Sequence, residues 1–168
     1  MANIQKKNIL KFISIPLFAV ASLLINFEGA TDTAYRDTAG IQTVCVGSTA
    51  NGPAKAPIDA RHVYTAQECA RRLEADLVPT YKAVVKSIKV TVTDGETAAY
   101  TSFAYNVGIG AWNGSSALKL LNQGNHRAAC DELPKWVYAG GVKVQGLVNR
   151  RAAERKLCIQ GLPLTDVD

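Results

Sequence analysis

The sequence lacks the residue patterns that metal sites and nucleic-acid interfaces require. Its 168 residues include two histidines, His62 and His126, which are not near any of the four cysteines in sequence, and no Cys-x-x-Cys motif is present. We therefore expect no metal site, zinc included. Zinc-finger spacing, an RNP motif and basic blocks interleaved with aromatic residues are also missing, so we expect no nucleic acid partner. No motif indicates a cofactor, and none is expected.

Internal repeats and low-complexity tracts are absent too, and the length suits one domain that buries most of its unfolded surface. The chain carries 19 basic and 14 acidic residues, which gives a net charge of +5 and a pI near 9.1. A positive protein is attracted to anionic polymers. Because nucleic acid is set aside, the charge favours a partner such as the bacterial cell wall.

Acidic residues are missing from the N-terminus, where Lys6, Lys7 and Lys11 precede an uncharged, mostly apolar stretch at residues 12–25. A basic segment followed by an apolar one is the layout of an export signal. As a helix, residues 12–27 would span about 24 Å, less than the roughly 30 Å of a bilayer's hydrocarbon core. We therefore expect this segment to insert only marginally.

The apolar segment should form a helix that ends at Glu28, because Val20, Leu24 and Phe27 follow a helical period and Gly29 is a usual stop. Two interpretations of its processing stay open. The small-x-small pattern at residues 19–21 matches a cleavage site, after which the mature chain would begin at the next residue. Cleavage would remove half of the helix, so we favour an uncleaved segment that can leave the membrane.

Two carboxylates follow the apolar segment in different surroundings. Glu28 ends the apolar helix, where desolvation would favour the protonated acid, whereas Asp37 lies in a polar turn and should stay ionised. Glycoside hydrolysis needs one carboxyl that donates a proton and a second that serves as base, nucleophile or stabiliser. The pair points to this chemistry, although a solvated helix end and a turn residue would show the same isolated spacing.

A small hairpin should bring the second carboxylate close to the first. Segments 34–38 and 41–46 are short, contain Tyr, Ile, Thr and Val, and are separated by a turn. Asp37 and Thr43 would then come from adjacent strands that face the helix end carrying Glu28.

The residues around this pair resemble the phage-type lysozymes of glycoside hydrolase family 24. The family's catalytic Glu, Asp and Thr positions fall on Glu28, Asp37 and Thr43 at the family's spacing. One departure is Ser48, where many members carry a His. The likeness covers residues 25 to about 160, in these separated motifs: Glu28-Gly29, Ala34-Tyr35-Arg36-Asp37-Thr38-x-Gly40, Thr43-Val44-Cys45-x-Gly47, Phe103-Ala104-Tyr105-Asn106-Val107-Gly108, Ala129-Cys130-Asp131-Glu132-Leu133, Trp136-x-Tyr138-Ala139-Gly140-Gly141 and Gly146-Leu147-x-x-Arg150-Arg151-x-x-Glu154-Arg155.

This resemblance implies hydrolysis of the β-1,4 bond between N-acetylmuramic acid and N-acetylglucosamine in peptidoglycan. Glu28 would be the general acid, Asp37 would orient a water or stabilise the oxocarbenium-like transition state, and Thr43 would hold that water. Family members are generally described as inverting, which needs about 6.5–9.5 Å between the carboxyls, and the sequence leaves the outcome open. Two other functions stay open: a lytic transglycosylase with a single Glu, and a catalytically idle wall-binding or membrane-tethered module.

Some endolysins of this family carry an uncleaved signal-anchor-release segment at the same position. By that analogy the host Sec machinery exports the chain, and residues 1–27 tether it, inactive, to the inner membrane until it is released into the host periplasm. Residues 28–168 would form the lysozyme domain, with a small β-containing lobe (28–64) and a helical lobe (65–168). We expect a monomer.

The resemblance implies a mostly α fold with a small β-hairpin lobe (α+β), two-lobed and lysozyme-like, with the cleft between the lobes. Residues 49–64 should form a loop. A capping box at 65–68 predicts a helix that reaches about Lys86, beyond a kink at Pro79. A second capping box at 93–96 predicts a helix that reaches Tyr105. Three later helices are expected: one capped by Ser115 or Ser116 and ended by Gly124, one over 126–138 disturbed at Pro134, and one over 147–159 closed by Gly161.

The four cysteines allow three pairings. An even count behind an export signal favours disulfides in an oxidising periplasm. We favour Cys45–Cys69 and Cys130–Cys158, because this pairing keeps each bond within one lobe. Free buried thiols would be expected instead if the chain stayed in the cytosol.

The family places an Arg near the catalytic Glu, and either Arg150 or Arg151 could fill that place. The alternative is that both are surface charges on a helix, paired with Glu154.

Aromatic and amide side chains give weaker predictions. Tyr35 and Asn106 could line the sugar cleft, or Tyr35 could pack within the hairpin. Trp136 and Tyr138 are expected in the core, because aromatic residues at helical spacing usually are buried.

Overall fold

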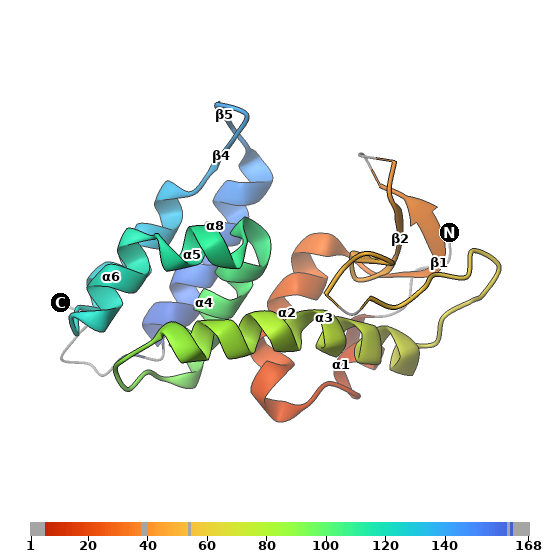
Figure 1. Ribbon diagram of the computed structural model, residues 1–168, viewed down its shortest axis with the longest axis horizontal. Helices are drawn as coiled ribbons and strands as arrows, with labels where there is room; N and C mark the ends of the chain where they lie inside the picture. The colour runs from red at the N-terminus through yellow and green to blue at the C-terminus, as the bar shows by residue number, and fades with distance from the viewer. Residues whose placement is uncertain (1–5, 38–39, 54, 161, 163–168) are drawn as a thin grey trace. The chain divides into compact units, whose positions relative to one another are not determined.

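The computed structural model describes residues 6–37, 40–53, 55–160 and 162 (Figure 1). It divides into two compact units, residues 1–79 (unit 1) and 80–168 (unit 2), and one long helix contains the boundary. The elements of unit 1 are α1 (Lys6–Leu10), α2 (Ile15–Glu28), β1 (Thr31–Arg36), β2 (Gln42–Cys45), β3 (Ser48–Thr49) and most of α3 (Ala66–Ser87). Those of unit 2 are α4 (Asp94–Val107), α5 (Ile109–Asn113), α6 (Ser116–Asn122), α7 (His126–Glu132), the 3-10 helix η1 (Leu133–Lys135), β4 (Tyr138–Ala139), β5 (Val142–Lys143) and α8 (Gln145–Gln160). The predicted mostly α fold with a small β part is confirmed, and the cleft between lobes stays a prediction.

Helix α2 buries one apolar stripe and ends at Glu28, as predicted. The buried residues recur at helical spacing, each at most 4% exposed: Leu17, Val20, Ala21, Leu24 and Ile25. Residues spaced three and four apart lie on one face of a helix. Glu28 is the next position on that face, and the short helix α1 packs against α2. The burial of this stripe therefore fixes where Glu28 is held.

Each end of α2 has a clear local cause. A turn separates α2 from α1, and the backbone N–H of Ser14 donates to Glu74 Oε1 on α3 at 2.5 Å. Pro16 lies in the first turn, where a missing N–H costs no helical hydrogen bond. Gly29, with φ of +78°, ends the helix and donates its N–H to the Ile25 carbonyl at 3.2 Å. Among the residues described, no helix is both long and apolar enough to cross a membrane.

The predicted hairpin is confirmed and is part of a slightly larger sheet. Strands β1, β2 and β3 pair antiparallel in that order. Tyr35 lies opposite Thr43, and Thr43 lies opposite Thr49. Two residues of the β1–β2 connection, 38 and 39, fall outside the described residues. The sequence indicated no third strand, because β3 is only two residues long.

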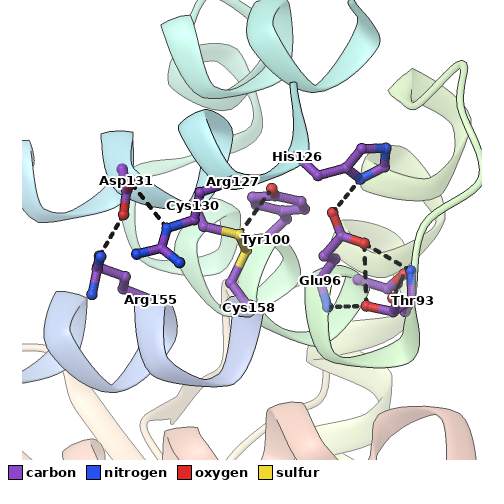
Figure 2. The surroundings of a disulfide bond; sticks show 10 residues. Thr93, Glu96, Tyr100, His126, Arg127, Cys130, Asp131, Arg155 and Cys158 are labelled. Atoms are coloured by element: carbon purple, nitrogen blue, oxygen red, sulfur yellow. Dashed lines mark hydrogen bonds and ion pairs between the residues drawn. A yellow bond between two sulfur atoms is a disulfide. The ribbon is translucent and has the colours of Figure 1, made fainter. Parts of the chain in front are cut away.

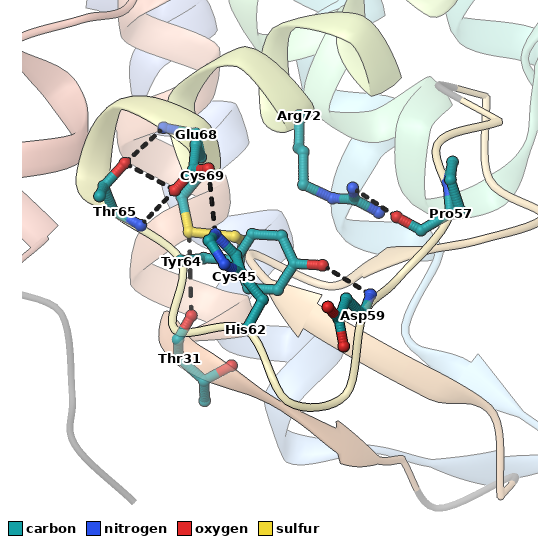
Figure 3. Close-up of polar contacts among 10 residues, drawn as sticks. All are labelled: Thr31, Cys45, Pro57, Asp59, His62, Tyr64, Thr65, Glu68, Cys69 and Arg72. Carbon is teal, nitrogen blue, oxygen red and sulfur yellow. Dashed lines mark hydrogen bonds and ion pairs between the residues drawn. A yellow bond between two sulfur atoms is a disulfide. The ribbon is translucent and has the colours of Figure 1, made fainter.

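A loop and a disulfide connect this sheet to α3 (Figure 3). The predicted capping box is present: Thr65 N–H donates to Glu68 Oε2 at 2.7 Å, and Glu68 N–H donates to Thr65 Oγ1 at 3.2 Å. The loop that precedes it is held by Arg72, which donates to two loop carbonyls and lies over the Tyr64 ring. The predicted Cys45–Cys69 bond is confirmed, with Cα atoms 5.1 Å apart.

Unit 2 is built around α4 and α8, which pack side by side (Figure 1). The predicted capping box of Thr93 and Glu96 opens α4, and Ser115, not Ser116, caps α6. A continuous core surrounds Trp112, which lies on the short helix α5 that the sequence did not predict. Its other large members include Tyr100, Phe103, Leu121 and Leu133.

The predicted helix over 126–138 is wrong in its second half. Helix α7 stops at Glu132 and is followed by the 3-10 turn that contains Pro134. Proline cannot continue a helix because it lacks the N–H and its ring clashes with the preceding turn. The chain then enters the β4–β5 hairpin. The last helix was placed correctly but begins earlier, at Gln145, and Gly161, its expected stop, lies outside the described residues.

The second disulfide joins the two helices that flank this region (Figure 2). Cys130 of α7 and Cys158 of α8 are bonded, with Cα atoms 5.8 Å apart, so the predicted pairing is confirmed. Asp131 bridges the same two helices, because it accepts from Arg127 at 3.2 Å and from Arg155 at 2.6 Å. The α7–α8 contact is therefore covalent and ionic as well as apolar.

Removing the Cys130–Cys158 bond should destabilise unit 2. The bond closes a loop with a sequence separation of 28, for which chain-entropy estimates give about 3–4 kcal/mol. We expect the double variant Cys130→Ala, Cys158→Ala to unfold at lower denaturant concentration by that amount, measured by circular dichroism in urea. Reductant should lower the midpoint of the parent chain further than that of the variant, and equal sensitivity to reductant would contradict the assignment.

Candidate active site

Glu28 is exposed at the C-terminal end of α2, beside the turn between β2 and β3. A Cβ atom added to Gly47 of that turn would lie 3.7 Å from Glu28 Oε2, and Gly47 has φ of +67°. The left-handed backbone favours glycine. The added Cβ would make only ordinary van der Waals contact with the carboxylate, so the positive φ, and not a lack of space, explains why a Gly follows Thr43 in this motif.

The exposure of Glu28 corrects one expectation. We expected apolar burial at the end of the helix to desolvate this carboxyl, but the buried stripe of α2 ends one turn earlier, at Leu24 and Ile25. The carboxyl itself projects beyond it. Desolvation of Glu28 therefore requires something other than α2 to cover it.

Asp37 is held by the hairpin that carries it. Its N–H donates to the Ile41 carbonyl at 3.0 Å, and its Oδ1 accepts from the Ile41 N–H at 2.9 Å. Arg36 closes the same connection by donating from Nη1 to the Gly40 carbonyl at 2.7 Å. These bonds fix the orientation of the Asp37 carboxylate, which is partly exposed.

Thr43 lies on β2 and is only 3% exposed. Its hydroxyl donates to the Ile41 carbonyl at 3.1 Å. A hydroxyl has one proton and two lone pairs, so the donated proton leaves the oxygen available to accept a hydrogen bond from a water. The arrangement suits a residue that positions a water molecule.

Tyr35 links these residues electrostatically. It lies opposite Thr43 on the neighbouring strand. Its pKa is raised above the usual value, first by burial and then by the negative charges of Glu28 and Asp37. Both carboxylates therefore raise the pKa of one phenol, an effect that depends on the tertiary structure and not on the spacing in the sequence. The three predicted residues and Tyr35 all lie in unit 1.

Unit 2 contains a second polar cluster, which is buried and centred on Glu154 of α8. Glu154 is fully buried and accepts from Ser102 Oγ at 2.7 Å, from Arg150 Nε at 3.2 Å and from Arg151 Nη1. Burial lowers the pKa of Arg151, and Glu154 opposes that shift.

The prediction that both arginines could be surface charges is wrong, because Arg150 and Arg151 are 4% and 1% exposed. The pairing with Glu154 is present, but inside the unit. Arg151 also donates to Asn106 Oδ1 and, from Nε, to the Trp136 carbonyl at 3.1 Å. That one of these arginines approaches Glu28 stays a prediction.

The two aromatic residues predicted in the core are exposed. Trp136 is 36% exposed and stacks edge-on against Phe103, with ring centroids 5.3 Å apart. Tyr138 is 63% exposed. The expectation failed because these residues lie after the 3-10 turn and on a strand rather than at helical spacing.

Comparison with known proteins identifies the family. The family model described as phage lysozyme matches residues 25–154. The chain belongs to the phage lysozyme family. It is 35% identical over 170 residues to a SAR-endolysin of bacteriophage PS119. That alignment covers 96% of this chain and 98% of the relative. It is an enzyme, a glycoside hydrolase of the lysozyme type.

Solved structures of related proteins share the fold. An endolysin from Escherichia coli O157:H7 phage FAHEc1 superposes with a TM-score of 0.77 at 31% identity, covering 89% of this chain and 94% of that one. The muramidase domain of SpmX from Asticaccaulis excentricus gives a TM-score of 0.75 at 26% identity, and the superposition covers 90% of this chain and 99% of that one.

The raised pKa of Tyr35 can be tested directly. We expect Glu28→Gln to lower the pKa of Tyr35 toward the usual value, because one of the two negative charges that oppose phenolate formation is removed. NMR of the labelled tyrosine ring carbons during a pH titration measures the shift, and Tyr35→Phe assigns the signal. Tyr100, whose pKa is raised by burial and by Glu96, serves as the control. An unchanged Tyr35 titration would show that Glu28 lies too far away to act on it.

Proposed function

We propose that this phage lysozyme is an endolysin, which cleaves the peptidoglycan of its bacterial host to cause lysis. The reaction is hydrolysis of the β-1,4 bond between N-acetylmuramic acid and N-acetylglucosamine. The observation that supports the proposal is that Glu28 and Asp37 both act electrostatically on Tyr35, which lies opposite Thr43 in the sheet.

Each residue has a distinct role in the proposed reaction. Glu28 donates a proton to the glycosidic oxygen, so that the leaving sugar departs as an alcohol. Asp37 orients the attacking water or stabilises the positive charge that develops on the sugar ring. Thr43 accepts a hydrogen bond from that water, since its own proton is donated to the Ile41 carbonyl. The bound glycan supplies the desolvation of Glu28 that α2 does not.

The proposed location is the host periplasm, reached through the inner membrane. Residues 1–27 serve as a signal-anchor-release segment, and residues 28–168 are the lysozyme domain, with a small lobe at 28–64 and a helical lobe at 65–168. The name of the PS119 relative, a SAR-endolysin, supports this assignment. So does the exposure of Phe12 and Phe18, each 48% exposed. Export by the host Sec machinery and a monomeric enzyme are part of the proposal.

Tethering silences the enzyme for a physical reason. In the membrane the buried stripe of α2 would lie in lipid, and Glu28 would be held at the bilayer surface. Release allows the same stripe to pack in the protein, which sets Glu28 beside the hairpin that carries Asp37.

Glu28→Gln should abolish lysis of outer-membrane-permeabilised Gram-negative cells, measured as loss of turbidity. The amide keeps the shape but donates no useful proton, so we expect activity to fall by about 100-fold or more. Glu132→Gln is the matched control, because Glu132 pairs with Lys135 at the surface of unit 2. Lysis by the Glu28→Gln variant at the rate of the parent would overturn the assignment.

The released muropeptides distinguish hydrolysis from lytic transglycosylation. Hydrolysis leaves reducing N-acetylmuramic acid ends, whereas a transglycosylase leaves 1,6-anhydromuramic ends. We expect reducing ends by mass spectrometry. Anhydromuramic ends would show that the reaction is lytic transglycosylation instead of hydrolysis. Binding to peptidoglycan without any released product would indicate an idle wall-binding module.

The fate of the N-terminal segment is tested by N-terminal sequencing after expression. We expect an intact Met1 or Ala2 in both membrane and soluble fractions, because α1 and α2 form part of the folded protein. A mature N-terminus at Ser22 would contradict the release model, since it would remove the first half of α2.

A further inference from the structure

The β4–β5 hairpin presents an exposed aromatic and apolar surface on unit 2. Tyr138, Val142 and Val144 are 63%, 66% and 38% exposed. Gly140 and Gly141 form its turn with φ of +56° and +79°, a conformation that suits a tight two-residue hairpin. Tyr138 is therefore an exposed aromatic side chain on a strand whose position the turn fixes.

The register of the hairpin gives this surface a defined chemistry. Tyr138 pairs directly with Lys143, and Ala139 pairs with Val142. Directly opposite residues on antiparallel strands lie on the same face. One face of the hairpin therefore carries a phenol ring and an ammonium group side by side.

The base of the hairpin is firmly attached to the rest of unit 2. Val144 N–H donates to the Val137 carbonyl at 2.9 Å, and Arg151 donates to the Trp136 carbonyl at 3.1 Å. The Trp136 ring packs against Phe103 of the core. A binding group on a rigid support loses little conformational entropy when a ligand arrives.

The hairpin itself carries one charged side chain, the exposed Lys143. The neighbouring Lys135 pairs with Glu132, and Arg150 and Arg151 are buried against Glu154. The positive charge that Lys143 presents beside Tyr138 fits a ligand that carries a carboxylate.

We propose that the β4–β5 hairpin is a second binding element for peptidoglycan, in which Tyr138 stacks on a sugar ring and Lys143 pairs with a carboxylate of the stem peptide. The inference rests on the proposed function and extends it to a substrate-binding surface outside the residues that do the chemistry. Peptidoglycan offers both groups next to each other, because each muramic acid carries an acidic peptide.

An anionic membrane is the other surface that an aromatic and basic hairpin could fit. Membrane insertion would place large apolar side chains at the tip, where they reach furthest into the lipid. The tip here is Ala139, Gly140, Gly141 and Val142, so it carries one large apolar side chain and no aromatic one. The observations therefore favour the glycan polymer.

The test uses the full chain in a Glu28→Gln background and measures co-sedimentation with purified sacculi. We expect Tyr138→Ala to weaken binding by about threefold to tenfold, as loss of an aromatic contact does. Tyr138→Phe should bind like the parent, because the ring is kept. Lys143→Ala should weaken binding by about twofold to fivefold, and this difference should shrink at high salt.

Lys156→Ala is the control, because Lys156 is exposed on α8 of the same unit. Unchanged unfolding midpoints would show that the hairpin variants are folded. Binding of Tyr138→Ala and Lys143→Ala at parent strength, or losses equal to that of Lys156→Ala, would overturn the proposal. Loss of binding to phosphatidylglycerol vesicles with sacculus binding intact would also overturn it, in favour of a membrane surface.

This outcome is independent of the catalytic assignment. Sedimentation measures binding, so the hairpin can fail while Glu28→Gln remains inactive, as proposed. If Glu28→Gln instead released muropeptides, the proposed function would fail. The sedimentation of the hairpin variants would then be repeated at low temperature, with the same expected ratios of variant to parent binding.

Discussion

The structure depends on the burial of a single apolar stripe on α2. Full burial of a large aliphatic side chain contributes roughly 1.5–3 kcal/mol, so the stripe contributes on the order of 10 kcal/mol, an upper estimate because the unfolded chain is partly compact. Lipid would bury the same side chains about as well, since acyl tails are as apolar as leucine. The segment can therefore exchange one apolar environment for another with a small net change in free energy. In the proposed release, this near balance makes the transfer possible. Glu28 reaches its place beside the β2–β3 turn only when the stripe packs in the protein.

A buried ionic cluster has a different role in unit 2. Pairs of this kind add little net stability, because desolvation of the charges offsets their attraction. The Glu154 cluster nevertheless joins three separate elements: α8 itself, Ser102 and Asn106 on α4, and the backbone at Trp136. Removing one member would leave an uncompensated buried charge, which is costly. The cluster therefore determines how the hairpin is attached to the helices rather than how stable the unit is.

Local signals in the sequence predicted the elements that have a chemical start or stop. The capping boxes at Thr65 and Thr93 and the stop at Gly29 are all in the structure, because each depends on hydrogen bonds within a few residues. The short helices α1 and α5 and the strands of two residues were missed, because they are too short to show a period. The helix expected over 126–138 ran past Pro134 to the first residue of β4, and the rest of the β4–β5 hairpin was not predicted.

The candidate site shows the same division between local and tertiary information. The spacing of Glu28, Asp37 and Thr43 could be recognised in the sequence, whereas the exposure of Glu28 and the effect of both carboxylates on the pKa of Tyr35 depend on how α2 meets the hairpin. If Glu28 is the general acid, as proposed, its exposure has a consequence for the enzyme. Water must be displaced from it by the substrate, so binding energy from parts of the glycan that do not react is used to prepare the carboxyl for proton transfer. A binding surface that holds a part of the glycan that does not react, such as the one proposed on the hairpin, would then affect the rate of cleavage as well as the affinity.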